Sequence, residues 1–293
     1  MEAKKARVYL VDGTYELFRA YFAVPSRRFG DAEVGATRGL LATLLALVSR
    51  PDVTHVACAF DHVIESFRND LFAGYKSGSG LPEELTSQFP LAEEASRALG
   101  IVTWPMVEFE ADDALATAAK RFEADPRVEQ VVICSPDKDL YQCVRGTRVV
   151  SWDRQRDKIY DEARVIEKLG VEPRLVPDFL ALVGDTADGI PGIPRWGKAS
   201  AARILAAHGE IRDIPDSPDK LRVSLRGALS LLGELRDRRV AAELYKVLAT
   251  LRTDAPLAER LEDLEYRGAD RSALQKFCAS IGAEEWLERS NIR

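Results

Sequence analysis

The sequence predicts an α/β fold with a mostly parallel sheet in its first part and a helical second part. Over the first 170 residues, short apolar runs alternate with amphipathic stretches, which is the pattern of parallel strands joined by helices. After Glu172 the chain is rich in helical patterns and poor in strand-like runs. A doubly wound or closely related three-layer α/β core is therefore expected.

Each element follows from its local pattern. Strands are expected at 7–11, 54–60, 101–103, 130–134 and 148–151, and helices at 15–21, 36–49, 82–99 and 112–124. In the second part, helices are expected at 175–183, 198–207, 219–225 and 227–252. A short strand at 261–266 and a helix at 272–281 are expected near the C-terminus.

The composition is that of a globular protein with a real core, since 46% of residues are hydrophobic and 30% are charged. No run approaches the ~20 apolar residues of a membrane span, and no signal peptide is visible. The four cysteines are scattered without C-x-x-C spacing, so zinc is not expected. A cytoplasmic monomer without a membrane partner is expected.

The net charge of −6 is unusual for a protein that acts on nucleic acid. If the acidic residues described next hold divalent cations, however, the bound cations neutralise them and the rest of the chain carries a net positive charge. The overall charge therefore neither supports nor excludes DNA as a partner.

Aspartates follow three of the predicted strands at the point where each strand ends. Asp12 closes VYLVD, Asp61 closes VACAFD, and Asp137 and Asp139 follow VVIC in the segment SPDKD. Ligands of open α/β sheets bind just beyond the carboxyl ends of the strands. These acids are therefore predicted to face one crevice.

Five further acids extend this set. Glu110, Asp112 and Asp113 open the helix before the fourth strand, and Asp185 and Asp188 lie in VGDTADGIPG. Glu110 and Asp113 share one face of that helix, whereas Asp112 points elsewhere unless it precedes the helix. If nine carboxylates converge without paired Arg or Lys, they repel each other unless cations lie among them. Oxygen ligands alone favour Mg²⁺ or Mn²⁺ over zinc.

Each acid also has an ordinary explanation when taken alone. Aspartates after strands are common turn residues, and Asp112 or Asp113 would favour a helix N-terminus. The Ser-Pro pair before Asp137 is typical of an N-cap followed by proline, which would place Asp137 and Asp139 in the first turn of a helix. The segment GDTADG is also consistent with a structural turn.

Five stretches of the chain resemble the 5′-nuclease family, which comprises flap endonucleases and the 5′–3′ exonuclease domain of bacterial DNA polymerase I. In the family's order they are LVDGTYELFRAYFA, AFDHVIESFRNDLFAGYK, FEADDALATAA, SPDKDLYQCV and LVGDTADGIPGI, spanning about residues 7–205. The resemblance implies a PIN-like three-layer core at 1–170, with an arch segment at about 62–100. It also implies a helical DNA-binding part at 171–293.

The resemblance implies that all nine acids ligate two or more Mg²⁺ or Mn²⁺ ions, with Asp113 completing the set. One ion is assigned mainly to Asp12, Asp61, Glu110 and Asp112, and the other mainly to Asp137, Asp139, Asp185 and Asp188. Two such ions activate a water and stabilise the attacking and leaving oxygens of a phosphodiester. As in the family, the products would carry a 5′-phosphate and a 3′-hydroxyl.

Four further residues match the family's basic and stacking positions beside the site. Lys76 and Arg68 are assigned catalytic roles, with the Lys76 ammonium steadying the scissile phosphate. Arg19 and Tyr75 are assigned to DNA binding, with the Tyr75 ring stacking on a terminal base. Without the resemblance, Arg68 and Lys76 would be solvated residues of a helix face. The SGSG at 77–80 departs from the family, which commonly carries another arginine there.

The segment IPGIPRWGKASAARIL resembles the family's helix-hairpin-helix, placed near 189–207. Gly192 and Gly197 would allow tight turns, and together with Lys198 would expose backbone N–H groups to a DNA phosphate. In the family, K⁺ often binds main-chain carbonyls there. Two departures are Arg195 in place of the usual middle glycine and Ala199 where a lysine is common.

Together these features predict a structure-specific 5′ nuclease for DNA with a free 5′ end, a flap or a branched junction. A PIN-type ribonuclease is an alternative, which the helical second part disfavours. A DNA-junction-binding protein that has lost catalysis is another, which the intact acids disfavour. The chain has no room for a polymerase domain, so a stand-alone nuclease is expected unless the chain is a fragment.

Overall fold

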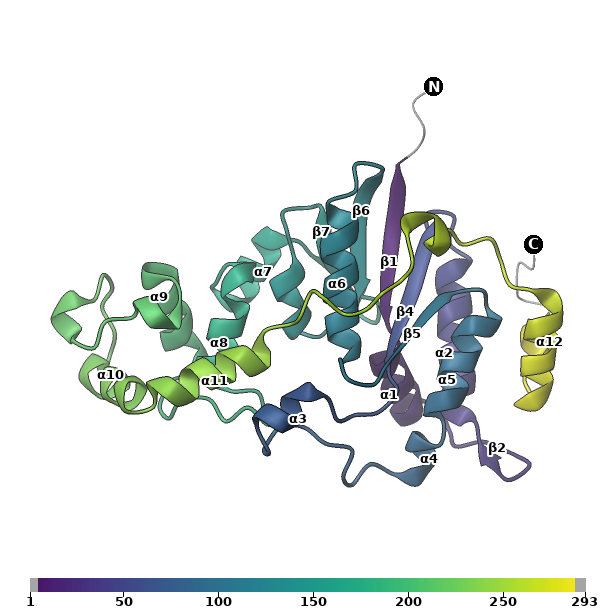
Figure 1. Cartoon of the computed structure of the whole chain (residues 1–293), viewed down its shortest axis with the longest axis horizontal. Helices are drawn as coiled ribbons and strands as arrows, with labels where there is room; N and C mark the ends of the chain where they lie inside the picture. The colour runs from purple at the N-terminus through teal and green to yellow at the C-terminus, as the bar shows by residue number, and fades with distance from the viewer. Residues whose placement is uncertain (1–4, 288–293) are drawn as a thin grey trace. The chain divides into compact units, whose positions relative to one another are not determined.

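In the computed structural model, which describes residues 5–287, strand β1 (Ala6–Asp12) lies inside a six-stranded sheet (Figure 1). The strand order is β5-β4-β1-β6-β7-β8. The parallel strands are β1, β4 (His55–Asp61), β5 (Val102–Met106) and β6 (Val128–Cys134). Strands β7 (Val149–Asp153) and β8 (Lys158–Tyr160) form an antiparallel hairpin. The predicted mostly parallel α/β fold is confirmed.

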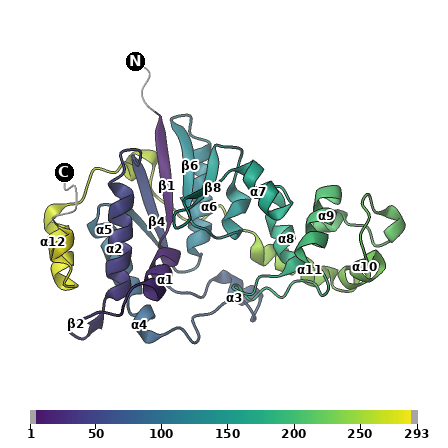
Figure 2. The ribbon, with the colours of Figure 1, turned by 180° about the vertical axis from the view of Figure 1, so that it is seen from behind.

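The central strands are apolar along their whole length because both of their faces are covered. Val8 and Leu10 of β1 are completely buried, as is Ala57 of β4. Helix α6 (Ala111–Glu123) covers one face of the sheet, and α1 (Gly13–Ala23) and α2 (Gly35–Val48) cover the other (Figures 1 and 2). Parallel strands buried in this way carry near-continuous runs such as VYLV and VACAF.

The chain divides into two units by compactness, and each unit is built from separated stretches of sequence. The first contains Met1–Ser66, Gly78–Ser135 and Arg252–Arg293, and the second contains Phe67–Ser77 and Pro136–Leu251. Strands β7 and β8 belong to the second unit. Besides the other elements above, the first unit contains β2 (Arg28–Phe29), β3 (Ala32–Glu33), α4 (Glu83–Thr86), α5 (Phe89–Ala98), α12 (Arg271–Ser280) and the 3₁₀-helices Leu261–Leu264 and Glu284–Trp286.

The second unit is mainly helical and has its own apolar core. Phe179 and Leu180 of α8 and Leu248 of α11 are buried in that core. The helices of this unit are α3 (Phe67–Leu71), η1 (Asp139–Cys143), α7 (Glu162–Leu169), η2 (Pro173–Leu175), α8 (Val176–Val183), α9 (Lys198–His208), η3 (Ile211–Asp213), η4 (Pro218–Lys220), α10 (Ala228–Asp237) and α11 (Arg239–Ala249). Between residues 5 and 287 no helix combines the length and the apolar character needed to span a membrane.

Two long helices predicted from the sequence are interrupted in the structure. The helix expected at 82–99 divides into α4 and α5, because Pro90 at the second position of α5 lacks the N–H that a continuous helix requires. The Gln88 side chain at the break accepts a hydrogen bond from the backbone N–H of Thr37 at 2.9 Å. The helix expected at 227–252 divides into α10 and α11 at Arg238, whose backbone leaves the helical region at φ −123°.

Two other elements in the C-terminal half of the chain were predicted wrongly. The helix expected at 219–225 is absent, and only the 3₁₀-helix Pro218–Lys220 forms there. The strand expected at 261–266 is instead the 3₁₀-helix Leu261–Leu264, followed by a single β-bridge between Glu265 and His55. The apolar residues at 261, 264 and 266 fit neither a strand nor a helix period well, and the segment is too short for its pattern to decide between the two forms.

Helix α7 was missed although its sequence carries clear signals at both ends. Asp161 is its N-cap and accepts a hydrogen bond from the backbone N–H of Arg164 at 2.9 Å. Gly170 ends the helix in the left-handed conformation at φ +77°. An Asp before and a Gly after an amphipathic stretch are the expected boundaries of a helix.

Candidate active site

Asp12 and Asp61 are the last residues of two adjacent parallel strands, β1 and β4. Their carboxylates therefore lie at the same edge of the sheet, as the sequence predicts. Asp12 is opposite Ala59 in the register, so Asp61 lies two residues further along its strand. Both are buried, with 6% and 9% of their surface exposed, which is rare for aspartate without a partner.

Each of these two carboxylates is held by a backbone N–H at the start of a helix. Asp12 Oδ1 accepts from Tyr15 N at 2.8 Å, and Asp12 Oδ2 accepts from Ser135 Oγ at 2.9 Å. Asp61 Oδ1 accepts from the N–H of Ala111 at 2.7 Å. These bonds fix the direction of both side chains, which is what a site that binds a cation requires.

The start of helix α6 adds Glu110 to the same unit. The helix begins at Ala111, so Glu110 is its N-cap, and Ser66 Oγ donates to Glu110 Oε1 at 2.6 Å. Asp113 is completely buried and accepts from Glu110 N (3.0 Å) and from Arg252 N (2.8 Å). Asp113 thus accepts a backbone hydrogen bond at the N-terminus of α6, which is the role that its position alone predicts. Its assignment as a metal ligand stays a prediction.

Asp112 is the second residue of α6 and is only partly buried. Because it does not precede the helix, it points away from the face shared by Glu110 and Asp113. Its assignment to the first ion also stays a prediction. The four acids assigned to that ion all belong to the first unit.

The second unit brings together three of the remaining acids. Single carboxylate oxygens of Asp139, Asp185 and Asp188 all lie within 4.8 Å of one another. Asp139 is the first residue of η1, and Asp137 orients it by accepting from Asp139 N at 2.9 Å. The segment after Ser135 is therefore a turn followed by a 3₁₀-helix, which corrects the expectation of an N-capped helix with both aspartates in its first turn.

Glycine is required on both sides of the Asp185 turn. Asp185 and Ile190 exchange two backbone hydrogen bonds of 2.8 Å, which close the turn. Gly189 has φ +73°, and a Cβ there would lie 2.2 Å from the carbonyl oxygen of Gly74. Through this contact the loop packs against the segment that contains Lys76. The backbone N–H of Lys76 donates to Asp188 O at 3.0 Å.

Two lysines accompany the acids of the second unit, which corrects the premise that these carboxylates lack basic partners. The Lys138 ammonium contacts Asp185 and lies 3.6 Å from Asp139 Oδ1. The Lys76 ammonium lies 3.5 Å from Asp188 Oδ1. Lys138 was missed because the sequence SPDKD gives no sign of the direction in which its side chain turns.

Even with these lysines, Asp137 and Asp139 are difficult to ionise. Burial raises the pKa of Asp139 well above its ordinary value, and the neighbouring charges of Asp137 and Asp188 raise it further. Burial also raises the pKa of Asp137. Asp139 Oδ1 is buried and has no hydrogen-bond partner within the described part of the chain. A divalent cation with oxygen ligands fits this arrangement, because it supplies both the missing partner and the missing positive charge.

Arg68 is buried in the second unit, where it binds the end of helix α11. Its side chain is completely inaccessible, and it donates to Leu248 O at 2.8 Å and to Thr250 O at 3.1 Å. These carbonyls lie at the end of α11, where the last C=O groups have no N–H donors within the helix. The geometry assigns Arg68 a role in holding α11, whereas its catalytic assignment stays a prediction.

Tyr75 and Arg19 are also engaged within the protein. The Tyr75 ring is 5% exposed and belongs to the apolar core of the second unit. Arg19 donates to the buried carboxylate of Glu16 at 2.9 Å and to Thr43 Oγ1 at 3.0 Å. Their assignments to DNA binding stay predictions, and in this arrangement the Tyr75 ring has little free surface on which a base would stack.

Gln142 is a residue that sequence reasoning missed. Its amide nitrogen donates to Asp139 O at 2.8 Å and to Ala249 O at 3.0 Å, and its amide oxygen accepts from Leu251 N at 2.9 Å. One side chain therefore joins the 3₁₀-helix that carries Asp139 to the end of α11. The only available signal was a polar residue within an otherwise apolar stretch, LYQCV.

The glycines of the predicted helix-hairpin-helix have different surroundings. Gly192 is buried at φ +71°, and a Cβ there would lie 2.5 Å from Gly184 N. Gly197 is exposed, is the N-cap of α9 at φ −104°, and has no atom within 4 Å of a Cβ position. Arg195 adopts the left-handed conformation at φ +70°, where the family's glycine would be unstrained and arginine costs roughly 1–2 kcal/mol.

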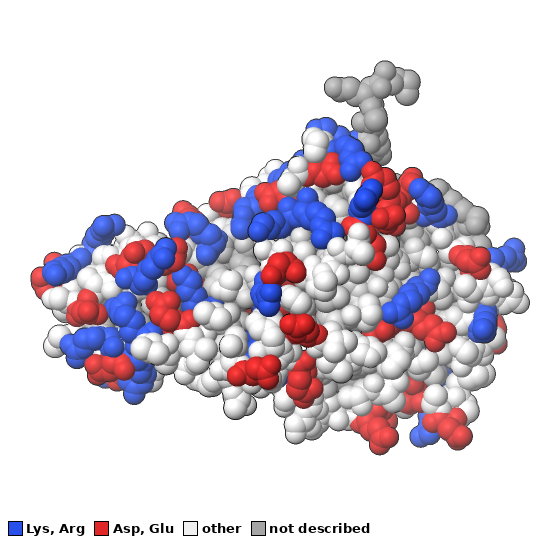
Figure 3. All heavy atoms as spheres, viewed as in Figure 1, with Lys and Arg blue, Asp and Glu red and all other residues white. Residues whose placement is uncertain are grey.

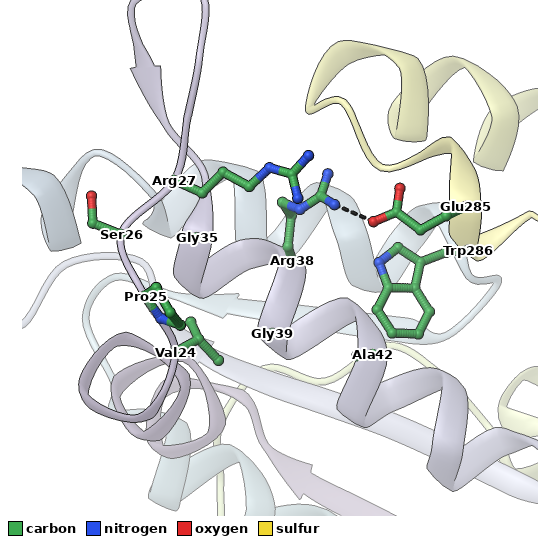
Figure 4. A pocket seen from close by; sticks show the side chains of 10 residues that line it. All are labelled: Val24, Pro25, Ser26, Arg27, Gly35, Arg38, Gly39, Ala42, Glu285 and Trp286. Carbon is green, nitrogen blue, oxygen red and sulfur yellow. Dashed lines mark hydrogen bonds and ion pairs between the residues drawn. The ribbon is translucent and has the colours of Figure 1, made fainter.

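A separate group of residues lines a cavity of about 460 Å³ in the first unit (Figure 4). Arg38 of α2 points from its floor toward the C-terminal segment, where it pairs with Glu285 and donates to Ile281 O at 3.2 Å. Glu285 is the one acid among the lining residues and is neutralised by this pair. The lining therefore differs in chemistry from the carboxylate sets and does not suit a divalent cation.

Basic and acidic side chains are interspersed on the face of the molecule drawn in Figure 3. This mixture agrees with 41 Lys and Arg against 47 Asp and Glu in the sequence. Surface charge on this face does not by itself identify where a polyanion binds.

The fold and the two carboxylate sets define a metal-binding α/β protein of the nuclease type. Residues 7–170 match the N-terminal resolvase-like domain of 5′-3′ exonucleases, and residues 171–272 match the C-terminal SAM fold of 5′-3′ exonucleases. The chain belongs to the 5′-3′ exonuclease family.

Among curated proteins, the chain is similar to bacterial DNA polymerases I. It is 32% identical to that of Bacillus caldotenax over 97% of the chain and 32% of the polymerase. It is 36% identical to that of Rhizobium leguminosarum over 89% of the chain and 26% of the polymerase. The chain therefore spans about a third or less of the length of these relatives.

Solved structures show the same fold at low sequence identity. A zinc-bound T5 5′-exonuclease matches with a TM-score of 0.68 at 18% identity, over 94% of this chain and 98% of that one. The catalytic core of Rad2 in complex with DNA substrate matches with a TM-score of 0.63 at 13% identity, over 97% of this chain and 91% of that one.

Replacing Arg68 separates a structural role from a catalytic one. Arg68→Met leaves carbonyls at the end of α11 without donors, so we expect the free energy of unfolding to fall by about 2 kcal/mol or more. Arg68→Lys should not restore it, because an ammonium lacks the planar fork of the guanidinium. Urea unfolding measures both, with the exposed Arg174→Met as the control. Wild-type stability combined with lost cleavage would instead establish Arg68 as catalytic.

Proposed function

We propose that this protein is a structure-specific 5′ nuclease that hydrolyses DNA phosphodiesters at free 5′ ends, flaps or overhangs. Two or more divalent ions, Mg²⁺ or Mn²⁺, serve as its cofactors. The observation that carries the proposal is the trio of the buried Asp139 and Asp185 and the partly buried Asp188, with an Asp139 oxygen that has no hydrogen-bond partner among the described residues. Membership of the 5′-3′ exonuclease family supports it.

The acids of the two units would each hold cations. Asp12, Asp61, Glu110 and Asp112 would hold one ion, and Asp137, Asp139, Asp185 and Asp188 the other. Bound ions of this kind lower the pKa of a water and stabilise the charge on the oxygens of a phosphodiester. The protein supplies fixed carboxylates, since Asp12, Asp61 and Glu110 are each oriented by hydrogen bonds from backbone or hydroxyl groups.

Lys76 would act on the substrate directly. Its backbone N–H donates a hydrogen bond to Asp188 O, which holds this residue beside the acids of the second unit. Its side chain is 24% exposed, so a phosphate would be able to reach it. A fixed cation at this position stabilises negative charge as it develops on the phosphate in the transition state.

The second part of the chain would grip duplex DNA. Gly197 and Lys198 are exposed at the N-terminus of α9, an eleven-residue helix whose free N–H groups suit a phosphate. The Rad2 catalytic core and a T5 flap endonuclease, which share the fold, are described as complexes with DNA. In the same proposal, residues 1–170 form the nuclease core with an arch at about 62–100, and carbonyls near 189–207 bind K⁺.

The proposal also covers the setting of the enzyme. It acts as a monomer on DNA with a free 5′ end or a branched junction, without a membrane partner. The four cysteines, all within the described residues, form no disulfide, which suits the reducing cytoplasm.

Two other functions make different demands on the same structure. A PIN-type ribonuclease would cleave RNA, and the match of residues 171–272 to the exonuclease SAM fold disfavours it. A DNA-junction-binding protein without catalysis would not need the acids, all nine of which are present. The deciding experiment is metal-dependent cleavage of 5′-labelled flap, duplex and single-stranded DNA and of matching RNA. Preferred cleavage of the RNA, or binding without cleavage, would establish one of the alternatives.

Asp139→Asn should abolish cleavage while stabilising the metal-free protein. The pKa of Asp139 is raised by folding, so its ionisation opposes folding above that pKa, and the penalty disappears below the unfolded pKa near 3.9. In EDTA, the variant should therefore melt at a higher temperature than wild type at pH 7, and the difference should vanish toward pH 4. Equal melting temperatures at both pH values, or wild-type cleavage by the variant, would contradict the proposal.

Gly197→Asp tests the DNA grip without disturbing the fold. The site has room for a Cβ, its φ of −104° suits any residue, and aspartate is a good N-cap, so folding should be unchanged. The added negative charge should repel a phosphate and weaken binding of a duplex-containing flap in Ca²⁺ by roughly tenfold. Gly197→Ala is the uncharged control. Unchanged affinity of the Asp variant would show that this turn does not contact DNA.

Lys76→Ala should slow the chemical step more than it weakens binding. Single-turnover cleavage should fall by on the order of 10²-fold or more, because a cation beside the reacting phosphate is lost. Affinity for the same flap in Ca²⁺ should change far less, since one phosphate contact among many is removed. A loss of affinity as large as the loss of rate would assign Lys76 to substrate attraction instead.

A further inference from the structure

Lys138 occupies an unusual place among the acids of the second unit. It lies between Asp137 and Asp139 in the sequence, and its ammonium contacts Asp185 and lies 3.6 Å from Asp139 Oδ1. It therefore faces two of the three carboxylates that would bind a divalent ion. The side chain is 39% exposed, so solvent reaches it and it has room to move away.

The surroundings explain why a cation is drawn there. Asp139 and Asp185 are 4% and 6% exposed, and carboxylates so poorly hydrated repel each other strongly. The ammonium reduces this repulsion but does not satisfy the site, because Asp139 Oδ1 still lacks a hydrogen-bond partner in the described structure. The same oxygens are the ones that a divalent ion would coordinate.

We propose that Lys138 is a displaceable counter-cation of this half of the metal site. The inference rests on the proposed function, since it assumes that Asp139, Asp185 and Asp188 bind a divalent ion. The ion and the ammonium compete for the same oxygens, so each ion that binds must first send the ammonium into solvent. The flexible four-carbon stem of lysine permits this movement without any change of the backbone. Lys138 thereby lowers the affinity for the ion and protects the protein from repulsion when the ion is absent.

Lys76 provides an internal comparison for the effect of charge alone. Its ammonium lies 3.5 Å from Asp188 Oδ1. Its main chain is fixed to Asp188 by a 3.0 Å hydrogen bond. Both lysines add a positive charge near the trio, and Lys138 lies against two of its three carboxylates, those of Asp139 and Asp185.

The test is a titration of the whole chain with Mn²⁺ in the absence of DNA, with free Mn²⁺ measured by electron paramagnetic resonance. Lys138→Met should lower the dissociation constant on the order of tenfold, because the competing ammonium is gone. Lys76→Met should have a clearly smaller effect, and the exposed Lys220→Met should have none. In EDTA, Lys138→Met should also lower the melting temperature, since the buried carboxylates lose their counter-cation.

The outcomes separate this inference from the proposed function. If wild type binds Mn²⁺ and Lys138→Met binds it equally well, the ammonium does not compete and the inference is wrong. If Lys76→Met tightens binding as much as Lys138→Met, the effect is one of overall charge and the inference is again wrong. If neither wild type nor any lysine variant binds Mn²⁺ more tightly than Asp185→Asn, the proposed metal site itself fails. Lys138→Gln repeats the measurement should the methionine variant fold poorly.

Discussion

The structure depends on holding several carboxylates, each removed from water, at fixed positions without letting their repulsion unfold the chain. Charge of one sign in a poorly hydrated place is among the most destabilising arrangements a protein can adopt. Here several of the acids are restrained by groups that carry partial or full positive charge. Backbone N–H groups restrain Asp12, Asp61 and Asp113, and the ammonium of Lys138 restrains Asp185. Binding of cations would then reduce the repulsion between carboxylates that is present in the metal-free protein.

The residues that hydrogen-bond to the acids explain why the sequence motifs contain more than the acidic residues alone. Thr14 Oγ1 accepts from the backbone N–H of Asp61, and Ser66 and Ser135 donate hydroxyl hydrogen bonds to Glu110 and Asp12. None of these three residues needs to touch a substrate. They matter because a carboxylate needs the correct orientation as well as the correct position in order to bind a cation.

The sequence was most informative where local chemistry and fold coincide. Buried strands that end in aspartate predicted both the sheet and the edge at which Asp12 and Asp61 lie, because parallel strands leave little choice of geometry. The positions of long side chains were not predictable. Nothing in the sequence indicates that Arg68 donates hydrogen bonds to carbonyls at the end of α11. The same holds for Gln142, which joins Asp139 to that helix, and for Lys138, which turns toward Asp185. Such contacts depend on packing between segments far apart in the chain.

Building the first unit from three separated stretches has a consequence for how the protein is made. Residues 1–66 and 78–135 leave the ribosome long before Arg252, yet the N–H of Arg252 is a partner of the buried Asp113 side chain. Chains fold domain by domain from the N-terminus during synthesis, but here the sheet-bearing unit must wait for the second unit to be translated before its last segment can join. Newly made chains therefore spend an interval with an incomplete core, during which chaperones would have an apolar surface to bind.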